Sequence, residues 1–348
     1  MKKIITAIFG VMLFCGTIFA GTAEVAPEGA HLLTFLYSPF PYSHAWDNDR
    51  NKHQIGYDMI NMANSLFGAE VIDGSYEADY WFYTLGYIWG ITPRLTFNAK
   101  LPYFHSVVNQ KVNISAPNEQ MTSMIQGALE SMDVRTEKLN GDGWGDLDVW
   151  LLYQYLNHEK WKISAGIGYR SQITATSFGK NTEKLNVGTQ EQDDILFNHN
   201  IDFKPFSFLG FNYELEFNEP LQGSKHTFVP NIGGKTVSYK PGWQITHEFE
   251  LKSYWWNDRV TLGYGYWYRN EGKATTGGVQ EEYDHDYAWD KIVISYSGIN
   301  DYRKKILPFP FLIDFTYWHL IKARNTRAYF GSYWEIQLTM PIYMAKDK

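Results

Sequence analysis

Apolar and polar residues alternate with a period of two in several stretches of the chain. In the clearest stretch, residues 161–173, Ile163, Ile167 and Tyr169 alternate with small or charged residues such as Lys162 and Arg170. The same alternation recurs at 209–217, 243–252 and 334–340. Successive side chains of a β-strand point to opposite faces of its sheet, so each stretch predicts a strand with one apolar and one polar face.

Strands of this kind are expected along the whole chain, at residues 30–38, 79–91, 95–105, 146–156, 161–173, 194–204, 207–219, 242–254, 260–270, 289–298, 307–319 and 327–341. Short connections at 92–94, 157–160, 205–206, 256–258 and 299–306 alternate with long ones at 39–78, 106–145, 174–193, 220–241 and 271–288. Short periplasmic turns and long extracellular loops are typical of outer-membrane barrels. The pattern predicts an all-β fold, a transmembrane antiparallel up-and-down β-barrel of about 12 strands.

The aromatic content separates this barrel from a soluble β-sandwich, which also shows alternation. Aromatic residues make up 17% of the sequence, with 25 Tyr and 13 Trp, and many fall at the ends of the expected strands. Membrane barrels carry aromatic girdles at both interfaces with water. After residue 23 there is no apolar run of about 18 residues, so no transmembrane helix is expected.

The first residues have the three parts of a secretory signal. Lys2 and Lys3 are basic, residues 4–20 are largely apolar, and small residues follow, including Ala20 and Ala23. Cleavage is expected after one of these two alanines, which gives a signal peptide at 1–23 and one barrel domain at 24–348. The expected location is the outer membrane, with its lipid, lipopolysaccharide and the barrel-insertion machinery as partners.

Two segments resemble a known family. Residues 90–95 read Gly-Ile-Thr-Pro-Arg-Leu and precede Leu101-Pro102-Tyr103, and residues 141–148 read Gly-Asp-Gly-Trp-Gly-Asp-Leu-Asp. In order and spacing they are similar to the outer-membrane transporters grouped as the phenol-degradation MetA-pathway family. That resemblance implies a channel for hydrophobic or aromatic compounds. The chain departs from the family at Pro93 and in lacking a terminal aromatic residue.

If the apolar faces meet lipid, the opposite faces line the lumen. The acidic residues expected there are Asp146, Asp148, Asp202, Glu214, Glu216, Glu248, Glu250, Asp314 and Glu335, and the basic ones are Lys100, Lys162, Lys204, Lys252, Arg170 and Arg269. One interpretation is a network of salt bridges that stiffens the wall. The other is a weakly cation-preferring passage lined by Glu214, Glu216, Glu248 and Glu250, because confined carboxylates recruit cations.

The long connection at 106–145 contains one helical pattern. Met121, Met124, Ile125, Leu129 and Met132 recur at the spacing of one helix face, and Asn118 is a candidate N-cap. The helix is expected either to pack on the barrel rim or to form a methionine-rich lid over the mouth.

No catalytic, cofactor or metal site is expected. The only Cys, Cys15, lies in the predicted signal, so the mature chain offers no thiolate. Asp284-His285-Asp286 is the one dense cluster, and in a loop such a cluster is usually solvated charge. The net charge of -7 argues against a nucleic-acid partner. The prediction is a passive channel for small solutes, with a structural or surface-interaction barrel, or a membrane-embedded hydrolase, as alternatives.

Overall fold

The computed structural model describes residues 22–42, 44–47, 49–54, 61, 64–65, 72–131, 137–171, 193–229, 233–280, 283–325 and 332–342. The predicted signal peptide therefore lies outside the described residues, except for Thr22 and Ala23.

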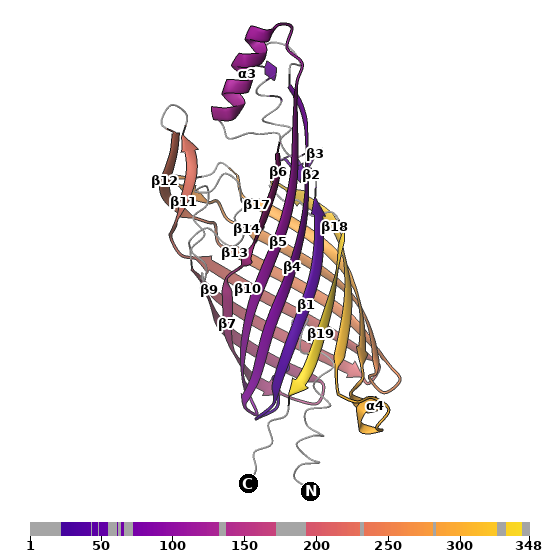
Figure 1. Cartoon of the computed structure of the whole chain (residues 1–348). Coiled ribbons are helices and arrows are strands. Elements are labelled where there is room, and N and C mark those ends of the chain that lie inside the picture. The colour runs from indigo at the N-terminus through magenta and orange to yellow at the C-terminus, as the bar shows by residue number, and fades with distance from the viewer. Residues whose placement is uncertain are drawn as a thin grey trace.

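The chain forms a closed antiparallel barrel of 12 strands, as the alternation predicted (Figure 1). The barrel strands are β1 (His31–Tyr42), β4 (Ile72–Thr92), β5 (Leu95–Ile114), β7 (Leu147–Asn157), β8 (Trp161–Ser171), β9 (Asp194–Phe206), β10 (Leu209–Pro220), β13 (Gln244–Trp255), β14 (Val260–Glu271), β17 (His285–Ser297), β18 (Leu312–Arg324) and β19 (Tyr333–Ile342). Each strand pairs with its neighbours in this order, and β19 pairs with β1 to close the ring.

The remaining elements lie in the connections. They are β2 (His44–Trp46), β3 (Lys52–Gln54), α3 (Glu119–Ser131), β6 (Glu137–Trp144), β11 (Gly223–Val229), β12 (Gly233–Lys240), β15 (Thr275–Thr276), β16 (Val279–Gln280) and α4 (Ile299–Arg303). Strands β11, β12, β15 and β16 form a small sheet of their own. We call the end of the barrel with the short turns the turn end, and the opposite end the loop end.

Three predicted connections are partly wrong, because β-structure continues into them. Strand β4 has 21 residues and β5 has 20, whereas about 9–11 residues cross a membrane. Residues 72–78 and 106–114 therefore belong to a two-stranded extension at the loop end, which β6 widens. At the turn end, Pro205 and Phe206 belong to β9 and not to the turn.

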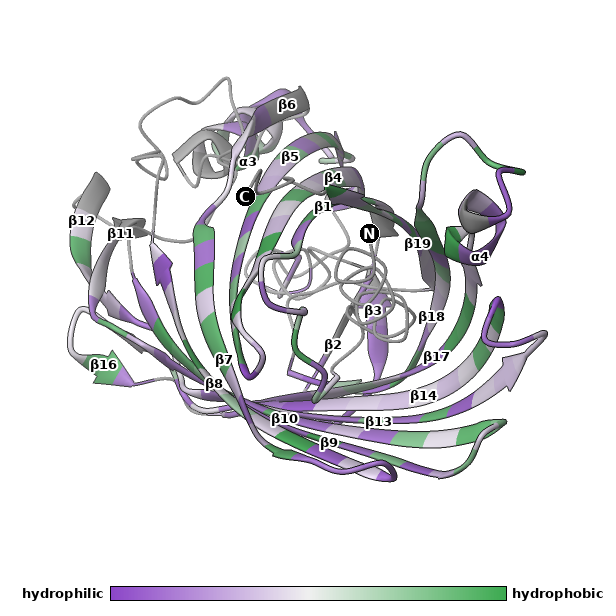
Figure 2. Ribbon diagram, turned by 90° about the horizontal axis from the view of Figure 1, so that it is seen from below, coloured by the Kyte–Doolittle hydropathy of each residue, from purple (hydrophilic) through white to green (hydrophobic). Residues whose placement is uncertain are grey.

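The two faces of each barrel strand differ in exposure. On β13, Phe249 and Leu251 are 52% and 43% exposed, whereas Glu248, Glu250 and Lys252 are at most 9% exposed. Apolar and polar bands alternate along the strands of the ring (Figure 2). Polar side chains thus face the inside and apolar side chains cover the outside, which is the reverse of a soluble protein and the arrangement that lipid requires of a barrel.

The predicted helix is present as α3. The Asn118 side chain accepts a hydrogen bond of 2.8 Å from the Met121 backbone N–H, so Asn118 is the N-cap, as expected. Figures 1 and 2 place α3 on the extension of β4, β5 and β6, to the side of the ring of strands. None of the helices in the described residues is long and apolar enough to cross a membrane.

Candidate functional site: the barrel interior

Four charged residues form an ion cluster in the wall of the barrel. The Lys291 ammonium bonds to Glu248 and lies 2.9 Å from a carboxylate oxygen of Glu250, and Lys252 lies 3.6 Å from Glu250. Across the strands, Gly265 stands between Glu250 and Lys291. A Cβ on Gly265 would lie 2.6 Å from Cε of Lys291, so the missing side chain lets the two charges meet across β14.

This cluster confirms the alternation but includes a residue that the sequence reasoning missed. Lys291, which precedes Ile292 on β17, is only 3% exposed and faces the inside of the barrel. The signal was present, because Ile292 and Ile294 are 51% and 47% exposed and mark the outer face. Lys291 lies on the opposite face by the period of two.

Two predicted lumen residues, Glu214 and Glu216, remain partly exposed on the inner face of β10. Glu214 is paired directly with Glu248 on β13, and like charges placed opposite each other repel. Glu216 lies 4.0 Å from Arg269. Lys100, on the inward face of β5, is exposed. Exposed and half-exposed charges on the inner face mean that the lumen contains space accessible to water.

Further pairs neutralise much of the remaining charge toward the loop end. Arg170 binds Asp148 with two hydrogen bonds of 2.6 and 2.9 Å, and it donates a third of 3.1 Å to Asp194. Arg269 donates to Thr246 and lies 4.0 Å from Glu271. These contacts are salt bridges of the kind that the first interpretation of the lumen charges describes.

Five aromatic rings, here called the aromatic patch, lie on the inner wall at the level of the ion cluster and on its loop-end side; Trp318 is paired directly with Lys291. They are Trp267 (β14), Tyr287 and Trp289 (β17), Trp318 (β18) and Tyr333 (β19). The ring centroids of Trp267 and Trp289 are 5.0 Å apart and those of Tyr287 and Trp289 are 4.9 Å apart. The sequence reasoning missed this aromatic patch, because it assigned the aromatic side chains to girdles at the strand ends.

Residues 22–27, here called the N-terminal strap, lie inside the turn end of the barrel. The Thr22 hydroxyl and the Ala23 backbone N–H donate to the Asp202 carboxylate at 2.7 and 2.9 Å. The Gln154 side chain donates to the Ala23 carbonyl at 2.8 Å. Asp202 and Gln154 belong to the inner faces of β9 and β7, so the N-terminal strap lies against the inner wall of the barrel.

Further along, the N-terminal strap reaches β5 and β4, which follow β7 in the wall. The Ala26 backbone N–H donates to the Thr96 hydroxyl at 2.8 Å. A Cβ on Gly90 would lie 1.9 Å from the Pro27 carbonyl oxygen, so only glycine allows this approach. Glu24 of the strap pairs with Lys162 of β8, another predicted lumen residue. The N-terminal strap therefore narrows the turn end.

The β2–β3 hairpin narrows the loop end, since it lies near the rim in Figure 1 and within the ring in Figure 2. Arg50 in its turn binds the Asp286 carboxylate with two hydrogen bonds of 2.9 and 3.0 Å. Arg324 donates to the same carboxylate at 2.6 Å. We call Arg50, Asp286 and Arg324 the latch.

The predicted Asp284-His285-Asp286 cluster is thus a set of structural contacts. Asp284 pairs with Arg324, and the His285 ring bonds to the Asn325 carbonyl. In the part of the chain that the structure describes, no three His, Cys, Asp or Glu side chains are grouped as metal ligands would be.

The other predicted site residues are placed as follows. Asp146 is buried just before β7. Glu335 accepts a hydrogen bond of 2.9 Å from the Trp318 indole. In α3, Ile125 is buried and Met124 is 62% exposed; Met121 is half-buried. Met132 lies outside the described residues, and nothing is described of the Leu129 side chain. The lid role of the helix stays a prediction.

No family model and no curated protein matches the chain. Among solved structures, it is similar to the COG4313 outer membrane channel from Pseudomonas putida F1, with a TM-score of 0.63 and 10% identity over 94% of this chain and 100% of that one. The translocator domain of the autotransporter NalP from Neisseria meningitidis matches with a TM-score of 0.42 and 10% identity, over 96% of each chain. The P. putida toluene transporter TodX matches with a TM-score of 0.41 and 10% identity, over 92% of this chain and 91% of that one. The first similarity shows that the chain has the fold of an outer-membrane barrel.

Proposed function

We propose that the chain is an outer-membrane channel for the passive uptake of small solutes, including aromatic and other hydrophobic compounds. The observation that carries the proposal is the water-accessible charge inside a closed barrel. Lys100 is exposed on the inner face, and Glu214 and Glu216 are only half-buried there. A barrel that served only as a support or adhesion surface would need no such space. The turn end then faces the periplasm and the loop end the outside.

The aromatic patch supports the narrower choice of solute. Its five rings lie on four adjacent strands, beside the ion cluster and on the side of it that faces the latch, so a solute entering from the loop end meets most of them before the cluster. Flat ring faces stack favourably on other aromatic rings. The two motifs at 90–103 and 141–148 point the same way, since they resemble the phenol-degradation MetA-pathway transporters, and we propose that the chain is a member of that family.

Single-channel recording of the refolded mature protein in planar bilayers tests this function. We expect discrete openings, and we expect micromolar to millimolar benzyl alcohol to shorten them. Replacing Trp289, which contacts two rings of the aromatic patch, with Leu should weaken that block. Replacing Trp256, which is 73% exposed in a turn outside the lumen, with Leu is the matched control. A folded barrel that never conducts would favour the structural or surface-interaction alternative.

Ion selectivity is a second readout of the same channel. Glu214 and Glu216 are half-buried inward carboxylates, whereas Glu248 and Glu250 are neutralised by Lys291. We expect a weak preference for cations in a KCl gradient, and E214Q should reduce it. E219Q, at an exposed residue that pairs with Lys240 beyond the lumen, should leave it unchanged. Anion preference in the unmodified channel would contradict the assignment of these carboxylates to the passage.

A further inference from the structure

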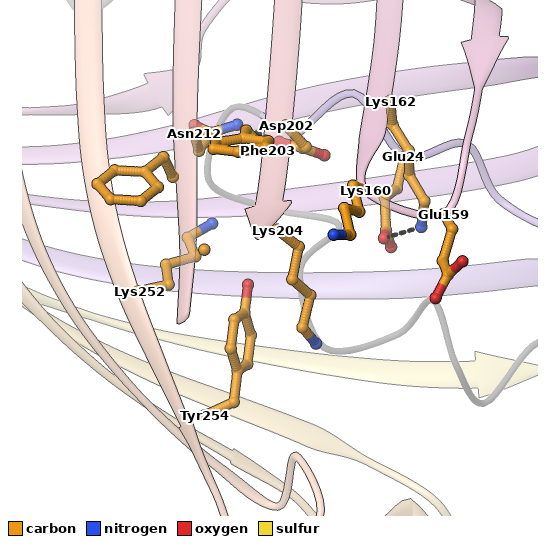
Figure 3. A pocket seen from close by; sticks show the side chains of 12 residues that line it. Glu24, Glu159, Lys160, Lys162, Asp202, Phe203, Lys204, Asn212, Lys252 and Tyr254 are labelled. Atoms are coloured by element: carbon orange, nitrogen blue, oxygen red, sulfur yellow. Dashed lines mark hydrogen bonds and ion pairs between the residues drawn. The ribbon is translucent and has the colours of Figure 1, made fainter. Parts of the chain in front are cut away.

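A small cavity lies at the turn end of the barrel, beside the N-terminal strap (Figure 3). Its volume is about 60 Å³, enough for roughly four water molecules or a group of similar size. Lys160, Lys162, Lys204 and Lys252 line it, together with Tyr254. These lysines come from the β7–β8 turn and from strands β8, β9 and β13, so cations from separate elements meet at one space. We call this cavity the lysine pocket.

Three carboxylates line the lysine pocket, and two of them have partners within the pocket, in the N-terminal strap or on β10. Glu24 pairs with Lys162. Asp202 accepts hydrogen bonds from Thr22, from Ala23 and, at 2.5 Å, from Asn212. In Figure 3, Glu159 lies on the far side of Lys162 from the other lysines. Of the residues that line the pocket, four are lysines and three are acidic, so the lining carries one net positive charge.

Lys252 is the most confined of the lysines. Its side chain is 6% exposed, and its contact with Glu250 is 3.6 Å long, which is beyond hydrogen-bonding distance. Glu250 is shared with Lys291, which lies closer to it at 2.9 Å. A buried ammonium that lacks a full set of acceptors is costly, so an additional anion at this point would be bound favourably.

Lys204 and Tyr254 complete the other wall of the lysine pocket. The Lys204 ammonium lies 3.9 Å from the centre of the Tyr254 ring, and its nearest ion pair, with Asp258, is 3.8 Å long. Opposite them, a Cβ on Gly210 would lie 2.9 Å from the Tyr254 hydroxyl. Because Gly210 has no side chain, the Tyr254 hydroxyl can pack against the wall at this position, and the space beside the lysines stays open.

We propose that the lysine pocket binds a small oxyanion, either the carboxylate of an organic acid or a phosphate group. The cavity has room for such a group, and its ammonium groups supply the charge-assisted hydrogen bonds that an oxyanion accepts. The proposal goes beyond solute passage and does not depend on it, because binding is measurable whether or not the barrel conducts.

Isothermal titration of the refolded protein in detergent at low ionic strength tests the proposal, with benzoate, inorganic phosphate and benzamide as probes. We expect saturable binding of at least one of the two anions and none of neutral benzamide, which has the shape of benzoate without its charge. Binding of benzoate alone would identify an organic acid as the ligand class, and binding of phosphate alone a phosphate group. K252M should weaken anion binding about tenfold or more.

The matched control is K304M, which removes an exposed lysine at the same end of the barrel, outside the pocket. It should leave binding unchanged. If K252M fails to fold, K204M replaces it, because the Lys204 side chain is 38% exposed and is not part of the packed wall. Binding of benzamide as tight as that of benzoate, equal anion binding by the pocket and control variants, or no binding of either anion would overturn the proposal.

Discussion

Replacing Arg50 with Gln should release the β2–β3 hairpin from the loop end of the barrel. The two hydrogen bonds of 2.9 and 3.0 Å between Arg50 and Asp286 join a side chain that is 41% exposed to one that is 3% exposed. A hydrogen bond to a charged group contributes about 1.5–3 kcal/mol when shielded, and exposure of the arginine reduces this strongly. We therefore assign about 1–2 kcal/mol to the pair, which corresponds to a change of about 5- to 30-fold in the ratio of released to docked hairpin.

The assay is single-channel recording at fixed voltage. In the unmodified protein the docked hairpin narrows the loop end. A channel with the hairpin released should conduct more, and this larger conductance level should be rarely occupied. In R50Q its occupancy should rise by about 5- to 30-fold, as the free-energy estimate requires. D49N, at an exposed neighbour in the same turn, is the control and should leave the occupancy unchanged.

Two results would refute this reasoning. The first is an R50Q trace that cannot be told apart from that of the unmodified protein, which would mean that the hairpin does not restrict the passage. The second is a double variant in which the effects of R50Q and D286N on the free energy of hairpin release simply add, since two residues that act through one contact should show a coupling energy. D286N alone should also loosen Arg324, which donates to the same carboxylate.

Four further predictions follow from other contacts. G265V would place a Cβ 2.6 Å from Lys291 Cε and would separate Lys291 from Glu250. Urea titration should therefore show a loss of about 2 kcal/mol in the free energy of unfolding. The control G127A, where the added Cβ meets open space, should show no loss. D202N removes the carboxylate that holds Thr22 and Ala23, so the conductance should increase severalfold if the N-terminal strap narrows the turn end, and an unchanged conductance would argue against that role. The hydrogen bond from the Asn51 backbone N–H, followed by that from His53, lowers the pKa of Asp47 to about 2. The contribution of Asp47 to the stability of the hairpin is thus complete above about pH 4 and is lost as the pH falls through about 2. Hairpin opening should therefore be the same at pH 7 as at pH 5 in both D47N and the unmodified protein, with a constant difference between the two proteins. The intact mass of the mature protein should correspond to cleavage after Ala20, because Thr22 and Ala23 make hydrogen bonds inside the barrel, and a mass that starts at Glu24 would contradict this.

Much of the fold could be predicted because a barrel strand obeys a local rule. Period-two alternation identified the strands, and the lengths of their connections identified the two ends of the barrel. The same rule placed Glu248, Glu250 and Lys252 on one face of β13, where the structure has them. It was less successful where its premise did not hold. Trp267 and Trp289 face inward, although the reasoning assigned the aromatic side chains to girdles at the strand ends.

The sequence by itself therefore determined the strands, their faces and the polar character of the lumen, since each depends on neighbours two residues apart. Only the tertiary structure decided which charges meet. Glu214 faces Glu248, and Glu250 reaches Lys291 across Gly265, because closure of the ring sets the register of strands that are distant in sequence. Thr22 meets Asp202, which is 180 residues away, and the hairpin turn at Arg50 meets Asp286, which is 236 residues away. No periodicity encodes such contacts, since they depend on where a segment outside the strands comes to rest in the closed barrel.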